Sequence, residues 1–168
     1  MKAGDPLDDG TQIGPITTMA QQAKVLAYIE HGKAEGLTLL TGGGKPPHLD
    51  GCFIEPTVFI DVPVASWREE IFGPVLCIRT FETEAEAVAL SNDSDFGLVA
   101  TVVCGDEQQG FRVANAIEAG HIWINSPQAI FVQTSWGGFK ASGIGRELGP
   151  WGMSSYLETK HITSRLRP

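Results

Sequence analysis

Residues 75–125 read VLCIRTFETEAEAVALSNDSDFGLVATVVCGDEQQGFRVANAIEAGHIWIN, and they alternate short apolar runs with polar, helix-forming segments. The apolar runs that predict strands are 75–81, 98–104 and 121–125. Strands that alternate with helices through short links favour right-handed crossovers. The stretch therefore predicts an α/β fold, with a parallel βαβαβ sheet and covering helices.

The helices between these strands carry recognisable start signals. Thr83-Glu84-Ala85-Glu86 has the spacing of a capping box and predicts a helix that runs to about Asn92. Asp106 caps the next helix, which we expect to stop at Gly120. Nearer the N-terminus, 17–35 predicts an amphipathic helix. The residues expected near one face of it are Met19, Ala23, Leu26 and Ile29.

Immediately before the first of these strands lies the segment Arg68-Glu69-Glu70-Ile71-Phe72-Gly73-Pro74-Val75. Glu70 could accept hydrogen bonds from a polyol such as a ribose, and Phe72 could pack against a flat ring. The alternative interpretation is structural, since Glu-Glu is often a solvated turn and Gly-Pro marks the entry to a strand. The residues by themselves leave both interpretations open.

Two segments follow the last predicted strand. Ligands of parallel α/β sheets bind beyond the carboxyl ends of the strands, so the mixed polar and aromatic loop 125–136 could line a pocket or merely cover the core. The glycine-rich stretch 136–149 lacks the Rossmann spacing, and its glycines predict close crossing of another segment. Residues 156–166 alternate apolar with polar and predict a terminal strand, paired with another subunit or plainly exposed.

Composition excludes several classes of protein. The 168 residues are 42% hydrophobic and 19% charged, enough for one sizeable core. A net charge of −8 disfavours nucleic-acid binding, which needs a basic face. The sequence has neither a long apolar run nor a signal-peptide pattern, so we expect no membrane partner and a cytoplasmic location. Its three cysteines and four histidines have no metal-ligand spacing.

Several blocks occur in the order in which the NAD(P)-dependent aldehyde dehydrogenases carry them, and the chain resembles that family over almost its entire length. The blocks are Gly4-Asp5-Pro6, Gly14-Pro15, Phe53-Ile54-Glu55-Pro56-Thr57, 69–75, Phe96-Gly97-Leu98, Ala119-Gly120, Trp123-Ile124-Asn125 and 137–143. Within the family, the wording is most similar to the betaine-aldehyde and aminoaldehyde dehydrogenases. The residues that suggest this are Trp67-Arg68-Glu69-Glu70, Ser135-Trp136-Gly137-Gly138 and 146–152.

The resemblance implies oxidation of an aldehyde to a carboxylic acid with NAD or NADP. It makes Glu70 the carboxylate that holds the nicotinamide ribose and Phe72 the aromatic beside the nicotinamide. Trp136 matches an aromatic of the substrate funnel, which suits cationic aldehydes through cation–π attraction. His121 stands where the plant relatives have a small or aliphatic residue that influences the fit of trimethylammonium, so betaine aldehyde specificity is in doubt.

The resemblance also implies how the chain is divided. Residues 1–139 match the C-terminal part of the catalytic domain, 140–156 a segment that packs on the coenzyme domain, and 157–168 the strand through which the family forms homo-oligomers. The backbone of Lys140 and Gly143 resembles a potassium site of some members.

Two departures limit what the chain does alone. The family's nucleophile lies in a Gly-Gln-x-Cys context and its general base in a Glu-Leu-Gly-Gly context, and the sequence contains neither. We therefore expect a C-terminal portion of a dehydrogenase with no catalytic residue of its own, starting downstream of the nucleophile and inactive alone. The alternative is a non-catalytic assembly module, which pairs with intact subunits or with a separate N-terminal half.

Overall fold

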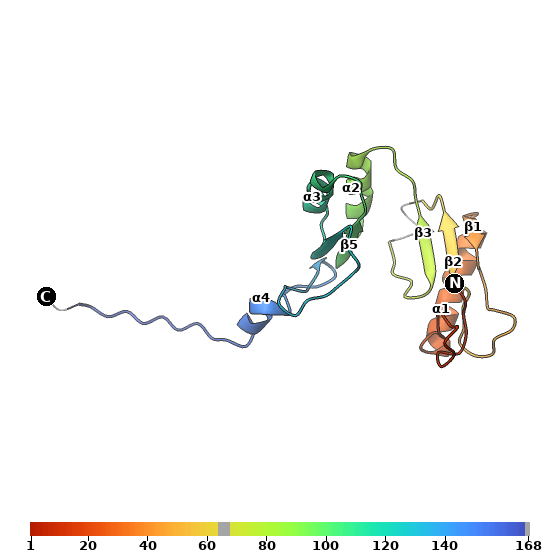
Figure 1. Ribbon diagram of the computed structural model, residues 1–168, viewed down its shortest axis with the longest axis horizontal. Helices are drawn as coiled ribbons and strands as arrows, with labels where there is room; N and C mark the ends of the chain where they lie inside the picture. Colours follow the sequence, from red (N-terminus) through yellow and green to blue (C-terminus); the bar gives the residue numbers. More distant parts are fainter. Residues whose placement is uncertain (64–67, 167–168) are drawn as a thin grey trace. The chain divides into compact units, whose positions relative to one another are not determined.

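The computed structural model describes residues 1–63 and 68–166 (Figure 1). Trp67, which contributes to the resemblance, lies outside the described residues. The chain divides into two compact units, Met1–Glu82 and Thr83–Pro168. None of the helices in the described part of the chain has the length and apolar character that a membrane crossing needs.

The first unit is organised by helix α1, Met19–Ala34. Thr18 caps it, because its hydroxyl accepts from the backbone N–H of Gln21 at 3.1 Å. The helix confirms the predicted one. Of its predicted apolar face, Ile29 is buried and Leu26 packs against the core, but Met19 and Ala23 are exposed. Met19 is 75% exposed. The residues that face the core are Gln22, Val25, Ile29 and Gly32.

Three short strands complete the first unit: β1 Thr38–Thr41, β2 Thr57–Ile60 and β3 Val75–Ile78. Strand β2 lies in the centre, antiparallel to β1 and parallel to β3. Val25 and Ile29 of α1 pack against Phe59 of β2 in the buried core. Fully burying such side chains contributes about 1.5–3 kcal/mol each, so the core fixes α1 on the sheet.

The second unit begins with two helices, α2 Glu84–Asn92 and α3 Glu107–Ala116. Thr83 caps α2 by accepting from the backbone N–H of Glu86, as the capping box predicts. Asp106 caps α3 by accepting from two backbone N–H groups. Helix α3 ends earlier than expected, at Ala116 rather than at Gly120.

Four strands and a short helix make up the rest of the second unit. They are β4 Phe96–Gly97, β5 Val99–Val102, β6 His121–Ile124, β7 Phe139–Lys140 and α4 Gly149–Ser154. Strands β5 and β6 pair in parallel, and β4 pairs antiparallel with β7. The Asn125 side chain continues the first ladder, because its amide donates to Cys104 O at 2.8 Å and its oxygen accepts from Cys104 N at 2.9 Å.

The predicted α/β class is confirmed, with parallel pairs in both units. Each strand is shorter than its apolar run, and the hydrogen-bonded parallel neighbours are β2 with β3 and β5 with β6. The pairing of β3 with β2 was not foreseen, since the first strand of the predicted βαβαβ stretch was expected to pair within that stretch.

The glycine-rich stretch crosses another segment closely, as its composition predicts. A Cβ on Gly120 would lie 1.8 Å from the carbonyl oxygen of Gly137, so only glycine fits there. The stretch is also tied back by a bridge between Trp136 and Glu147, whose backbone groups exchange hydrogen bonds of 2.8 and 2.7 Å.

The terminal strand predicted for residues 156–166 does not form within this chain. Residues 157–166 carry no strand assignment, and all of them are exposed. Their pairing with another subunit stays a prediction.

Candidate functional site

Glu70 and Phe72 lie in an exposed loop that leads into β3. Both side chains are open to solvent, and the ring of Phe72 is 70% exposed. Phe72 also has a positive φ of 53°, which is uncommon for a residue with a side chain and indicates a backbone constrained by its surroundings. An exposed aromatic on a constrained backbone is available for contact with something outside the unit.

Helix α1 holds this loop at three successive points. The side-chain amide of Gln21 donates to the carbonyl oxygens of Ile71 at 3.1 Å and Phe72 at 2.9 Å. The Tyr28 hydroxyl donates to the Glu69 carboxylate. Val25, which lies between Gln21 and Tyr28 on the helix, packs against Gly73, where an added Cβ would come within 2.6 Å of a valine methyl.

The hydrogen bond between Tyr28 and Glu69 has an electrostatic signature. It raises the pKa of the Tyr28 phenol above 10.0, with smaller contributions from burial and from the negative charge of Glu69. The Lys24 ammonium also lies over the Tyr28 ring, 5.7 Å from its centroid. The Tyr28 side chain is therefore held from both sides.

The chemistry of this loop fits one end of a dinucleotide. A carboxylate accepts hydrogen bonds from vicinal hydroxyls, and an exposed ring packs on a flat heterocycle. Glu70 and Phe72 supply these two groups within three residues.

Three aromatic rings of the second unit pack together. The His121 ring lies 4.3 Å from that of Trp123 and 5.5 Å from that of Trp136, and the two indoles are 6.3 Å apart. Strand β6 carries His121 and Trp123, and the bridge to Glu147 fixes Trp136. Trp123 is 7% exposed, and its indole N–H donates to Ala129 O at 2.8 Å.

His121 and Trp136, which the resemblance joins as substrate residues, are thus in contact. Both are partly exposed, so one side of the ring cluster is accessible. Aromatic faces carry negative electrostatic potential and attract organic cations by about 0.5–2 kcal/mol. The cluster can therefore favour a ligand that bears an ammonium group.

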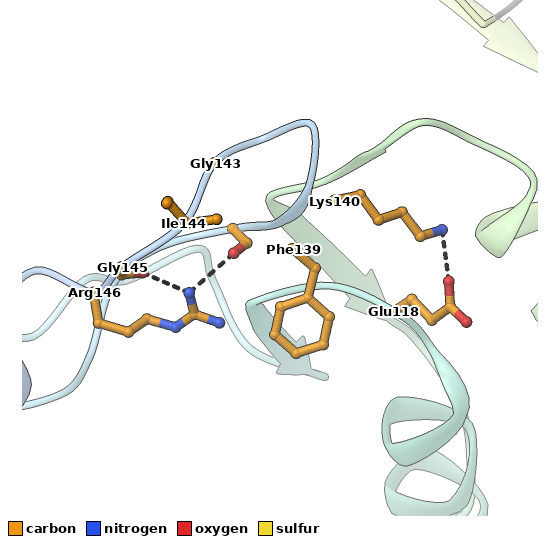
Figure 2. A pocket seen from close by; sticks show the side chains of 8 residues that line it. Glu118, Phe139, Lys140, Gly143, Ile144, Gly145 and Arg146 are labelled. Carbon is orange, nitrogen blue, oxygen red and sulfur yellow. Dashed lines mark hydrogen bonds and ion pairs between the residues drawn. The ribbon is translucent and has the colours of Figure 1, made fainter.

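Lys140 ends β7, Gly143 lies in the turn that follows it, and both residues line an open pocket of about 610 Å³ (Figure 2). The Lys140 ammonium forms an ion pair of 2.7 Å with Glu118 and donates to Asn92 O at 2.8 Å and Ser94 O at 3.1 Å. Two backbone carbonyls and a carboxylate therefore already surround the charge of this side chain.

The second positively charged side chain of this pocket, Arg146, also has hydrogen-bond partners. The Arg146 guanidinium donates to Gly138 O at 2.9 Å and Gly145 O at 2.6 Å, and it lies 5.3 Å from the Phe139 ring centroid (Figure 2). Across residues 1–63 and 68–166, no three His, Cys, Asp or Glu side chains gather as a metal site. A monovalent cation here would depend on backbone carbonyls such as that of Lys140, which accepts from Gly143 N at 3.3 Å.

The three cysteines, Cys52, Cys77 and Cys104, are partly buried and form no disulfide. Burial raises the pKa of the Cys77 thiol, which lowers its thiolate fraction. Cys104 is tied to Asn125 and to the Asp106 carbonyl. These surroundings agree with assigning no catalytic role to Cys77 or Cys104.

Each candidate pair is close in space within its own unit: Glu70 with Phe72, His121 with Trp136, and Lys140 with Gly143. The prediction missed the side chains that hold the first pair, Gln21 and Tyr28. Their spacing on α1, with Val25 between them, is a helical i, i+4, i+7 pattern that could have revealed them. The predicted apolar face shares Leu26 and Ile29 with the side that packs on the core, but it left out the positions that contact the loop.

The chain belongs to the aldehyde dehydrogenase family, whose model matches residues 1–162. It is 48% identical over 166 residues to the chloroplastic aminoaldehyde dehydrogenase ALDH10A8 of Arabidopsis thaliana. This match covers 97% of this chain and 33% of that protein. The chloroplastic betaine aldehyde dehydrogenase of Atriplex hortensis is 44% identical, over 98% of this chain and 33% of that enzyme. A peroxisomal aminoaldehyde dehydrogenase of Pisum sativum is 48% identical.

Solved structures agree with these relatives. Betaine aldehyde dehydrogenase from Staphylococcus aureus, in complex with NAD+, superposes with a TM-score of 0.90 at 42% identity, over 96% of this chain and 33% of that one. A double mutant of the same enzyme, also with NAD+, gives a TM-score of 0.92 at 43% identity. The chain therefore spans about a third of the length of the relatives it matches.

Proposed function

We propose that this chain acts within an NAD(P)-dependent aldehyde dehydrogenase that oxidises an aldehyde to the carboxylic acid. The observation that carries the proposal is the exposed pair Glu70 and Phe72, on a loop that α1 holds at three points. The chain contributes this cofactor contact and part of the substrate wall.

At the cofactor end, the Glu70 carboxylate would accept hydrogen bonds from the ribose hydroxyls, and Phe72 would pack beside the nicotinamide. The bound dinucleotide supplies the acceptor for the hydride that leaves the substrate. Relatives solved with NAD+ support NAD as the first cofactor to test, and NADP is the second.

At the substrate end, the partly exposed rings of His121 and Trp136 face an aldehyde that carries a positive charge, and the buried ring of Trp123 packs behind them. The His121 ring contacts both indoles and occupies space beside them. A primary ammonium is smaller than a trimethylammonium group, so an aminoaldehyde suits this cluster better than betaine aldehyde. The named plant relatives include enzymes of both kinds.

The covalent part of the reaction lies outside this chain. Aldehyde oxidation in the family needs a cysteine thiolate that attacks the carbonyl and a base that activates water. The sequence contains neither Gly-Gln-x-Cys nor Glu-Leu-Gly-Gly. The polypeptide therefore needs these groups from elsewhere before it takes part in turnover.

The test measures NADH formation from an aminoaldehyde and from betaine aldehyde. The purified chain is assayed alone and after refolding with a polypeptide that carries the missing two segments from a related dehydrogenase. We expect no turnover alone and turnover in the mixture. Turnover by the chain alone would contradict the proposal that the nucleophile and the base come from another polypeptide. Stable assembly without any turnover would favour the non-catalytic assembly module.

Two variants connect the activity to the proposed residues. Phe72→Ala should raise the KM for the dinucleotide, and Trp136→Ala should raise the KM for cationic aldehydes about tenfold while the KM for a neutral aldehyde changes less, because cation–π attraction contributes about 0.5–2 kcal/mol. Equal effects of Trp136→Ala on charged and neutral aldehydes would contradict the substrate proposal.

Three further expectations accompany this function. Potassium would bind through the carbonyls of Lys140 and Gly143, and replacing potassium by a bulky organic cation in the buffer should then lower the stability of the assembled enzyme. Residues 157–168 would pair with a neighbouring subunit of a homo-oligomer. The location is proposed to be cytoplasmic, and because named relatives are chloroplastic or peroxisomal, cell fractionation decides it.

A further inference from the structure

We propose that Gln21 and Tyr28 are positioning residues, which hold Glu70 and Phe72 in the geometry that binds the nicotinamide end of the dinucleotide. The inference deepens the proposed function and rests on it for the identity of the ligand. It concerns side chains that touch the loop and not the reacting atoms.

The first step is geometric. We call the contacts of Gln21, Val25 and Tyr28 with the loop 69–73 the clamp. Gln21, Val25 and Tyr28 lie on one face of α1, and each meets a different point of the loop. The carbonyls that Gln21 engages belong to Ile71 and Phe72, which directly follow Glu70. Gln21 therefore fixes the backbone at Ile71 and Phe72, while Tyr28 holds the side chain before Glu70 and Val25 packs on the glycine after Phe72.

The second step is the cost of losing it. Phe72 has a positive φ and an exposed ring, so the loop itself offers little to hold this conformation. Without the Gln21 donors, the Phe72 backbone is free to relax to a commoner conformation. A ligand would then have to order the loop as it binds, which lowers its affinity.

The third step is selectivity: losing the clamp should weaken binding of the dinucleotide and leave binding of the aldehyde unchanged. The clamp touches residues 69–73, which carry the dinucleotide contacts. The aromatic cluster is held by other bonds, those of Trp123 with Ala129 and of Trp136 with Glu147. Loosening the clamp should therefore change the KM for the dinucleotide and leave the KM for the aldehyde nearly unchanged.

The neighbouring residue supplies a matched control. Gln22 is buried, and its side-chain amide donates to Gly51 O at 3.1 Å and Phe53 O at 2.8 Å. It thus makes the same number of bonds, from the same helix, to a different loop. Gln21→Met and Gln22→Met each remove two donors with little change in side-chain volume.

The first experiment measures hydrogen exchange of the full chain. Gln21→Met should speed exchange of the loop 68–74 and leave the loop 51–53 unchanged, whereas Gln22→Met should do the reverse. Tyr28→Phe keeps the ring and removes only the hydroxyl, so it gives a milder version of the first result. Unchanged exchange at 68–74 in both Gln21→Met and Tyr28→Phe would refute the clamp.

The second experiment uses the assembled dehydrogenase and measures both KM values. We expect Gln21→Met to raise the KM for NAD+ about five- to tenfold, since the loop loses both of the hydrogen bonds that Gln21 donates, with the KM for the aldehyde within about twofold. Gln22→Met should lower the melting temperature without raising the KM for NAD+ relative to the KM for the aldehyde. An equal rise of both KM values would reduce Gln21 to a structural role.

The two proposals fail in different ways. If the wild-type assembly shows no dependence on NAD+ or NADP+, the proposed function is wrong, whatever the hydrogen exchange shows. If the wild-type assembly uses the dinucleotide and Gln21→Met leaves its KM unchanged, only the positioning role is wrong.

Discussion

The Tyr28 phenol reports directly on the loop that carries Glu70. Its pKa is raised above 10.0 chiefly by the hydrogen bond to Glu69. A folded-state pKa above the unfolded value means that this contact contributes its full stabilisation below about pH 10 and loses it as pH rises through the folded-state pKa. The chain contains two tyrosines, Tyr28 and Tyr156.

We therefore expect the single phenol of a Tyr156→Phe variant to ionise above pH 10 when followed by ultraviolet absorbance. Adding Glu69→Gln should bring the titration back toward pH 10, because the acceptor loses its charge and about half of its hydrogen-bond strength. A phenol that titrates at the same pH in both backgrounds would show that the contact with Glu69 is absent in solution.

Gly120 offers a second test at the residue scale. An added Cβ would meet the Gly137 carbonyl at 1.8 Å, so Gly120→Ala must push the two backbone segments apart. Overpacking of this kind costs about 1–3 kcal/mol. Gly105→Ala is the matched control, since nothing lies within 4 Å of its added Cβ. Denaturant unfolding followed by tryptophan fluorescence should separate the two variants, and equal stability would contradict the close crossing.

At the scale of elements, an ion pair joins helices α2 and α3 of the second unit. Glu84, in the first turn of α2, accepts from the Arg112 guanidinium of α3 at 2.7 and 2.8 Å. The hydrogen bond with Arg112 lowers the pKa of Glu84 to about 2, with smaller contributions from Gln109 and from the charge of Arg112. A lowered pKa means stability that is present above about pH 4.5 and is lost as pH falls toward 2.

Glu84→Gln should therefore lower the melting temperature at neutral pH, and the difference from wild type should shrink through this acidic window. The pair is exposed, so we expect added salt to reduce the difference as well. A difference that stays constant from pH 7 to pH 2 would show that Glu84 acts through something other than its charge.

Elements were easier to predict from sequence than the contacts between them. The caps at Thr83 and Asp106 depend on local hydrogen bonds, and the structure has both. The buried face of α1 depends on what packs against it, and there the apolar pattern was misleading, since polar Gln22 is buried and Met19 is exposed. The clamp of Gln21 on residues fifty positions away was missed for the same reason.

At the scale of the whole molecule, the terminal segment is notable for its exposure, since residues 157–166 are all exposed. Leu157, Ile162 and Leu166 are 65%, 80% and 92% exposed. Ordering such a segment costs conformational entropy that burial must offset. Residues 157–166 bury little of their surface here, so a partner that pairs with them would supply that burial.

Removing residues 157–168 should therefore leave the helical circular dichroism signal and the melting temperature nearly unchanged, because the described residues of this segment are all exposed. The same deletion should abolish association between copies of the chain, or between the chain and related dehydrogenase subunits, in sedimentation experiments. Ile162→Ser is a milder companion, which should weaken association without shortening the backbone. If the truncated and intact chains sediment alike, with the same distribution of species, then this segment does not mediate assembly and the homo-oligomer must form through another surface.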